Sequence, residues 1–67
     1  MLNRRDIIEL ARELPNPAER TLVLGLCDTT FGDARIYEAQ ERTDISEEAR
    51  DLLEDLDKAL FYRDRDR

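Results

Sequence analysis

The sequence predicts an all-α fold, a small bundle of three to four short helices in a single domain of residues 1–62. Three observations lead to this prediction. Residues that favour helix N-caps stand directly before apolar segments at Asn3, Asn16 and Ser46. The apolar residues of segment 47–62 recur with a period near 3.6 rather than 2. No apolar run has a convincing partner strand.

The first helix is expected over about residues 4–14. Asn3 is a good N-cap, and Asp6 three residues later imitates a capping box. The apolar stripe begins at Ile7, and Pro15 ends the helix because proline cannot continue it.

The second helix is expected over residues 17–31. Its start is marked by the cap Asn16, a proline at the first helical position and Glu19 as the distal residue of a capping box. Gly32 supplies a residue that tolerates the left-handed conformation at the end. The run 22–27 is apolar around most of the helix circumference, which is typical of a central helix packed on more than one side.

A tight corner at Gly32 and Asp33 leads into a third segment, residues 34–43, because Asp33 can cap a helix that starts at once. We expect a helix there. The amphipathic pattern is weak, so a strand over Arg35–Ala39 stays open as an alternative.

The fourth helix, residues 47–62, has the clearest pattern. Ser46 is its N-cap, and Glu47 and Glu48 lie in the first turn, where the helix dipole favours negative charge. Residues 63–67 alternate in charge and are expected to form a frayed tail. The residues expected to build the core are Leu22, Leu26, Leu52, Leu53, Leu56 and Leu60.

Composition argues against several classes of function. The 67 residues include no histidine and one cysteine, which argues against a histidine base, a His–metal site or a cysteine cluster on zinc. Cys27 lies in the most apolar stretch and is expected in the core. No apolar run approaches the ~20 residues of a membrane span. We therefore expect a cytoplasmic protein that is not an enzyme and has no catalytic residues, metal or cofactor.

Negative charge is concentrated in the last helix. The chain carries a net charge of −6, and residues 44–62 hold seven acidic residues against two basic ones. This acidic face is either a solvated outer surface or a recognition surface for a basic protein partner. In the second case the predicted partner-binding residues are Glu47, Asp51, Glu54, Asp55 and Tyr62.

The leading functional expectation is an acidic protein–protein interaction module, an inhibitor or regulator that covers a basic, nucleic-acid-binding surface of its partner. Phage-type anti-CRISPR and anti-restriction proteins are analogous in size and charge only. Two alternatives stay open. The corner before Ala34 would suit a helix-turn-helix DNA binder, although the net charge argues against direct nucleic-acid binding. The leucine stripe of segment 47–62 would also suit a homodimer or a small homo-oligomeric assembly subunit.

Overall fold

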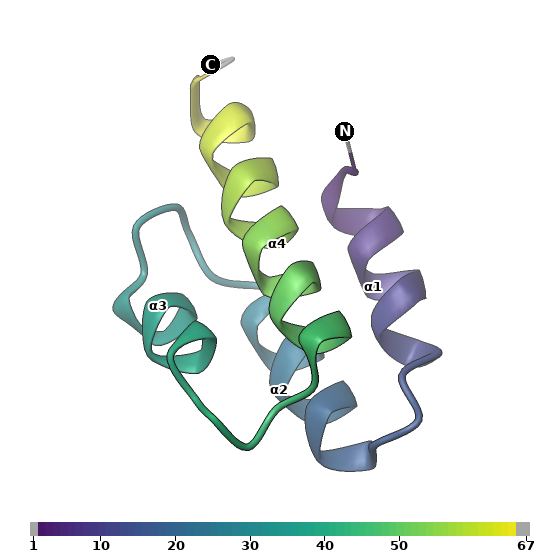
Figure 1. Cartoon of the computed structure of the whole chain (residues 1–67). Helices are drawn as coiled ribbons and strands as arrows, with labels where there is room; N and C mark the ends of the chain where they lie inside the picture. Colours follow the sequence, from purple (N-terminus) through teal and green to yellow (C-terminus); the bar gives the residue numbers. More distant parts are fainter. Residues whose placement is uncertain (1, 66–67) are drawn as a thin grey trace.

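The computed structural model describes the backbone of residues 2–65 and the side chains of residues 2–62. Within these residues it contains no strand and four helices: α1 (Arg4–Arg12), α2 (Pro17–Leu26), α3 (Ala34–Gln40) and α4 (Glu47–Arg65) (Figure 1). The all-α prediction is confirmed. The segment for which a strand was an alternative is helical.

All four helices begin at the predicted N-caps. At α1 the predicted capping box is present: the Asn3 side chain accepts from the Asp6 amide at 2.9 Å, and the Asp6 carboxylate accepts from the Asn3 amide at 3.3 Å. The other three caps accept an N–H from two or three residues on: Asn16 from Ala18 at 2.9 Å, Asp33 from Arg35 at 2.9 Å and Ser46 from Ala49 at 3.2 Å. Each cap satisfies an amide that the helix leaves without a partner.

The ends of the helices differ from the prediction. α1 ends at Arg12 rather than 14, because Pro15 disfavours helical geometry for the residue before it. α3 ends at Gln40 rather than 43, and α4 continues to Arg65 rather than 62. The frayed tail predicted from residue 63 is wrong for residues 63–65, where neither glycine nor proline interrupts the helix. The rest of that tail, residues 66–67, lies outside the described residues.

The largest difference is at α2, which ends at Leu26 instead of residue 31. The Thr29 hydroxyl and the Thr29 amide both donate to the Leu26 carbonyl, at 2.7 and 3.1 Å, and this tight turn replaces further helix. Gly32 has the positive φ expected of it, 84°, but it lies in the connection before α3.

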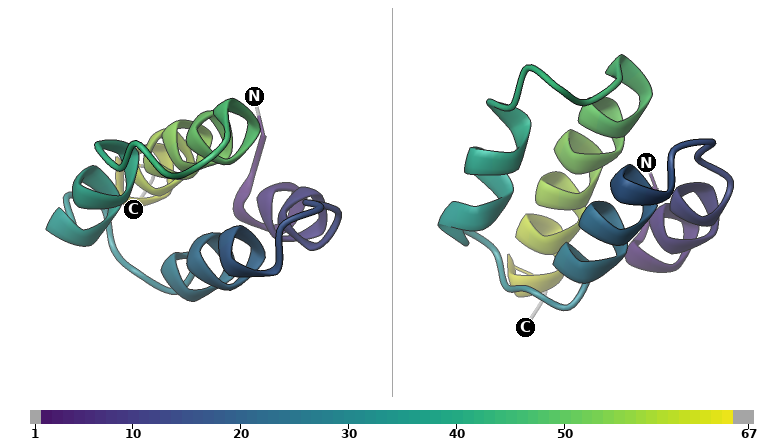
Figure 2. Two further views of the ribbon diagram at one scale, coloured as in Figure 1. Left: turned by 60° about the horizontal axis from the view of Figure 1, so that its bottom comes forward. Right: turned by 90° about the horizontal axis from the view of Figure 1, so that it is seen from below.

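α2 contacts all three other helices, so it is packed on more than one side as predicted. α4 also contacts all three, with α1 running antiparallel on one side and α3 on the other (Figures 1 and 2). Leu22 is only half-buried at the edge of the core, whereas the other five predicted core leucines are buried. The buried core residues are Ile7, Ala11, Leu14, Val23, Leu26, Cys27, Ile36, Ala39, Ala49, Leu52, Leu53, Leu56 and Leu60.

Glu19 joins the starts of α2 and α4. Its side chain is only 6% exposed, and its Oε1 accepts hydrogen bonds from the Ser46 amide at 2.9 Å and from the Ser46 hydroxyl. The expected capping box within α2 is therefore wrong for Glu19, which bonds Ser46 rather than the amide of Asn16. This contact fixes the end of α4 that carries Glu47 and Glu48.

Candidate protein-binding surface

A groove runs between the antiparallel helices α1 and α4. It encloses about 380 Å³ and shares Leu2, Leu10 and Glu13 with an adjoining hollow of about 270 Å³ on the outer side of α1. Apolar side chains form the floor: Leu2, Leu10, Leu14 and Leu52. Carboxylates border this floor as two rims: Glu13 on the α1 side, and Glu48, Asp51 and Asp55 on the α4 side. Asp6 and Glu9 add two carboxylates in the adjoining hollow. We call these ten residues the acidic groove.

The rims follow from helical spacing. On α1 the acids Asp6, Glu9 and Glu13 are three and four residues apart, so they share one flank of the helix. On α4 the spacing of Glu48, Asp51 and Asp55 is the same. Because the two helices pack side by side, Glu13 of α1 borders the same groove as the acidic flank of α4, whereas Asp6 and Glu9 line the adjoining hollow on α1. None of the described residues that line the acidic groove is a lysine or arginine.

The five predicted partner-binding residues do not form one site. Asp51 and Asp55 line the acidic groove. Glu47 and Glu54 are exposed but are not among its lining residues, and the Glu54 carboxylate lies 3.4 Å from the Lys58 ammonium. Tyr62 is 44% exposed and lines a different hollow.

Sequence reasoning missed Glu48 as a site residue and all three acids of α1. The signal for the α1 acids was present, since a spacing of three and four residues along a helix already predicts a shared face. What the sequence did not contain was the pairing of that face with α4. Only the packed structure brings the two rows together.

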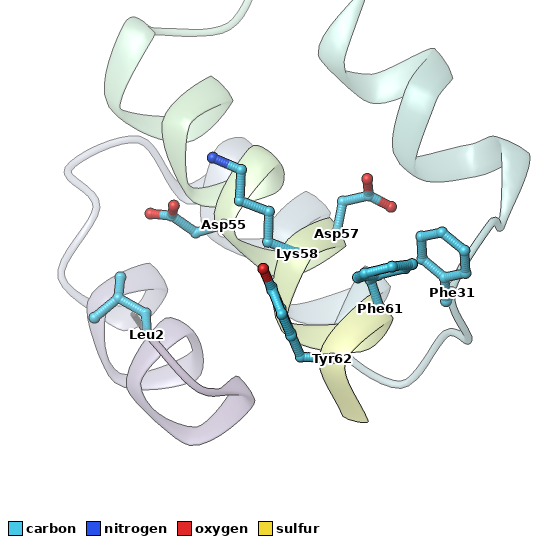
Figure 3. A pocket seen from close by; sticks show the side chains of 7 residues that line it. All are labelled: Leu2, Phe31, Asp55, Asp57, Lys58, Phe61 and Tyr62. Carbon is cyan, nitrogen blue, oxygen red and sulfur yellow. The ribbon is translucent and has the colours of Figure 1, made fainter. Parts of the chain in front are cut away.

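The hollow beside Tyr62 is aromatic. It measures about 580 Å³ and shares Leu2 and Asp55 with the acidic groove (Figure 3). Phe31 and Phe61 meet edge to face with ring centroids 4.9 Å apart, and the Tyr62 ring lies 5.4 Å from Phe61. Asp55, Asp57 and Lys58 also line this hollow, so aromatic and charged side chains share it.

The opposite flank of α4 is engaged by α3. The Arg50 guanidinium donates to the carbonyls of Gln40 at 3.2 Å and Arg42 at 2.8 Å, which satisfies the C-terminal end of α3. Partial burial raises the pKa of the Tyr37 hydroxyl, and the charge of Asp57 and a hydrogen bond to it raise that pKa further. These contacts join α3 to the flank of α4 that lies away from the acidic groove.

The structure lacks the tight corner that motivated a helix-turn-helix motif. The seven residues 27–33 separate α2 from α3, whereas that motif has a turn of about 3–4 residues. Arg35 is held by both carboxylate oxygens of Asp33, at 3.1 and 2.9 Å, and Arg42 by those of Asp44, at 2.9 and 2.7 Å. These hydrogen bonds lower the pKa of Asp33 and of Asp44. Both arginines are thus already paired with carboxylates.

Cys27 is 2% exposed, and its thiol donates to the Val23 carbonyl at 3.2 Å. Burial raises the pKa of the thiol, and the nearby charge of Asp28 adds to that effect. A thiol in this setting is a poor nucleophile at neutral pH.

Searching the described residues finds no group of three or more His, Cys, Asp or Glu side chains placed to hold a metal ion. In the same part of the chain, no helix has the length and apolar character needed to cross a membrane.

The chain was compared with protein-family models, curated proteins and solved structures. No protein-family model, curated protein or solved structure matches this chain.

Proposed function

We propose that this chain is a protein–protein interaction module that covers a basic surface of a partner protein. The observation that carries the proposal is the acidic groove, in which four carboxylates from two helices border an apolar floor and two more line the adjoining hollow. A basic surface that normally binds nucleic acid is the class of partner surface that fits it, because such surfaces are built to meet rows of negative charge. The protein would then act as an inhibitor or regulator of its partner.

The physical support is the combination of charge and apolar surface. Opposite charges across an interface favour the correct partner and penalise a like-charged one. Leu10 is 40% exposed at the bottom of the rims, so it offers apolar area that a partner can remove from water. Solvated acidic surfaces that serve only solubility have no need of such a floor.

The two alternatives have less support. The helix-turn-helix interpretation depended on a tight corner between α2 and α3, whereas the seven residues 27–33 separate these two helices. The assembly subunit depended on an available leucine stripe. Leu52, Leu53, Leu56 and Leu60 are instead buried within the chain's own core.

A charge-reversal experiment tests the proposal. The triple variant Glu13→Lys, Asp51→Lys, Asp55→Lys, at three positions that line the groove, is immobilised beside the wild type, and both are exposed to a lysate of the natural host. We expect the wild type to retain a basic nucleic-acid-binding protein that elutes at moderate salt, since exposed charges are screened within about 10 Å at 0.1 M. The triple variant should lose it.

The matched control is Asp28→Lys, Glu38→Lys, Glu41→Lys. It changes net charge equally, and its three positions are exposed outside the acidic groove. Circular dichroism checks that both variants keep their helix content. Equal loss in the two variants, or undiminished capture by the first, would contradict the proposal.

A further inference from the structure

We propose that the acidic groove holds one amphipathic α-helix of the partner, with an apolar stripe bordered on both sides by lysine or arginine. This inference rests on the proposed function and specifies the occupant of the same surface. It depends on the shape of the groove, its floor and its two rims.

The length of the groove suits a short helix. Its lining on α4 extends from Glu48 to Asp55, and on the facing side it extends from Leu10 to Leu14, with Leu2 beyond them. Seven residues of helix rise about 10 Å, or two turns. A partner helix lying along the groove would therefore contact it over two to three turns, the usual scale for a helix bound in a groove.

The floor is apolar and incompletely covered. Leu14 and Leu52 are buried, whereas Leu2 is half-buried and Leu10 is exposed. Leu10 also lines both hollows, so it lies where they join. An amphipathic helix offers apolar side chains every three or four residues along one face, which matches a linear floor of this kind.

The rims define the charge of the occupant. Carboxylates lie on both sides of the floor, with Glu13 on one side and Asp51 and Asp55 on the other. An apolar stripe seated on Leu10 therefore needs cations along both of its edges. A polyanion is repelled by the same rims, and a second copy of a chain with net charge −6 lacks the overall attraction.

The test uses two synthetic peptides of identical composition. The first, of about 18 residues, carries leucine at helical spacing with arginine on both flanks, a length at which an isolated helix can form. The second has the same residues permuted so that no apolar stripe forms. Each carries a fluorescent label, and its affinity for the full chain is measured by anisotropy at about 0.15 M salt.

We expect the striped peptide to bind at least about tenfold more tightly, with chemical-shift changes in the protein centred on Leu10 and Asp51. Equal affinity of the two peptides would overturn the groove-bound helix while leaving the acidic surface as a general site for basic proteins. Absence of binding by either peptide would overturn the groove-bound helix, and failure of the lysate capture would separately overturn the proposed function.

Variants of the protein test the floor and the rims. Leu10→Asn should weaken binding of the striped peptide by about tenfold, whereas Ala34→Asn, at an exposed position on α3, should leave it unchanged. The rim variant Glu13→Gln, Asp51→Asn, Asp55→Asn should also weaken it. Its charge-matched control, Asp28→Asn, Glu38→Gln, Glu41→Gln, should have a much smaller effect.

Equal effects of the rim variant and its control would mean that net charge alone attracts the peptide, which would overturn the proposal. If sedimentation showed that the wild type is a dimer and that Leu10→Asn is a monomer, the groove would be assigned to a second copy of the chain. That result would also overturn the proposal.

Discussion

Glu19 has a role that follows from the folded arrangement rather than from its neighbours in sequence. Its position three residues after Asn16 is that of a capping-box residue, yet its carboxylate accepts two hydrogen bonds from Ser46. A buried carboxylate is tolerated where hydrogen bonds replace the water it loses. Glu19, at the start of α2, thus supplies the hydrogen-bond acceptor for Ser46, the residue that caps α4.

Removing this carboxylate is expected to destabilise the fold. Glu19→Ala leaves the Ser46 amide and hydroxyl without their acceptor and should lower the free energy of unfolding by about 1–3 kcal/mol. Glu19→Gln keeps an oxygen acceptor and should cost less. Urea denaturation followed by circular dichroism measures both.

Glu38→Ala, at an exposed position of α3, serves as the control and should change the free energy of unfolding by less than about 0.5 kcal/mol. A Glu19→Ala variant as stable as this control would show that the contact with Ser46 contributes nothing to stability.

At the scale of elements, the two glycines of the chain have opposite roles. Gly25 lies in the last turn of α2, is exposed, and has no heavy atom within 4 Å of where a side-chain carbon would stand. Gly32 lies in the connection to α3 with φ at 84°, a conformation that other residues rarely adopt. The first is replaceable, whereas the second is required by the backbone.

Replacing each glycine by alanine should therefore change the free energy of unfolding in opposite directions. Gly25→Ala should raise the free energy of unfolding by about 0.5–1 kcal/mol, because alanine loses less conformational freedom in a helix. Gly32→Ala should lower it by about 1–2 kcal/mol, because alanine is strained at positive φ. Urea denaturation of the two variants measures both values. If both variants were destabilised equally, Gly25 would have a packing role that its open surroundings do not show.

For the whole molecule, the burial of the leucine stripe bears on oligomeric state. The radius of gyration is 11.0 Å, close to the value of about 11 Å expected for a compact chain of this length. The apolar face of α4 is directed against α1, α2 and α3 of the same chain. A folded monomer needs no second copy to cover that face.

We therefore expect the thermal midpoint to be independent of protein concentration over about a hundredfold range. Circular dichroism at the lower concentrations and differential scanning calorimetry at the higher ones cover that range. A midpoint that rises with concentration would instead favour the assembly subunit.

The parts of this fold that could be predicted from sequence are those decided by a few adjacent residues. The caps at Asn3, Asn16, Asp33 and Ser46 depend on local hydrogen bonds and were all predicted correctly. The ends of the helices depend on competing turns, such as the one at Thr29, and these were not predicted.

The candidate surface could be predicted only in part, for a related reason. Asp51 and Asp55 follow from the pattern of α4 alone. Glu13 belongs to the same groove only because α1 packs antiparallel to α4, and the rotation of one helix against another is decided by the whole core. Neither sequence spacing nor net charge contains that information.

The hydrogen bond between Glu19 and Ser46 also has a consequence for the order of folding. It joins residues 27 positions apart, so it forms only after the connection through α3 has closed into a loop. A contact that is absent from the transition state acts mainly by slowing unfolding. We therefore expect Glu19→Ala to shorten the lifetime of the native state more than it slows folding, which stopped-flow measurement of both rates would test.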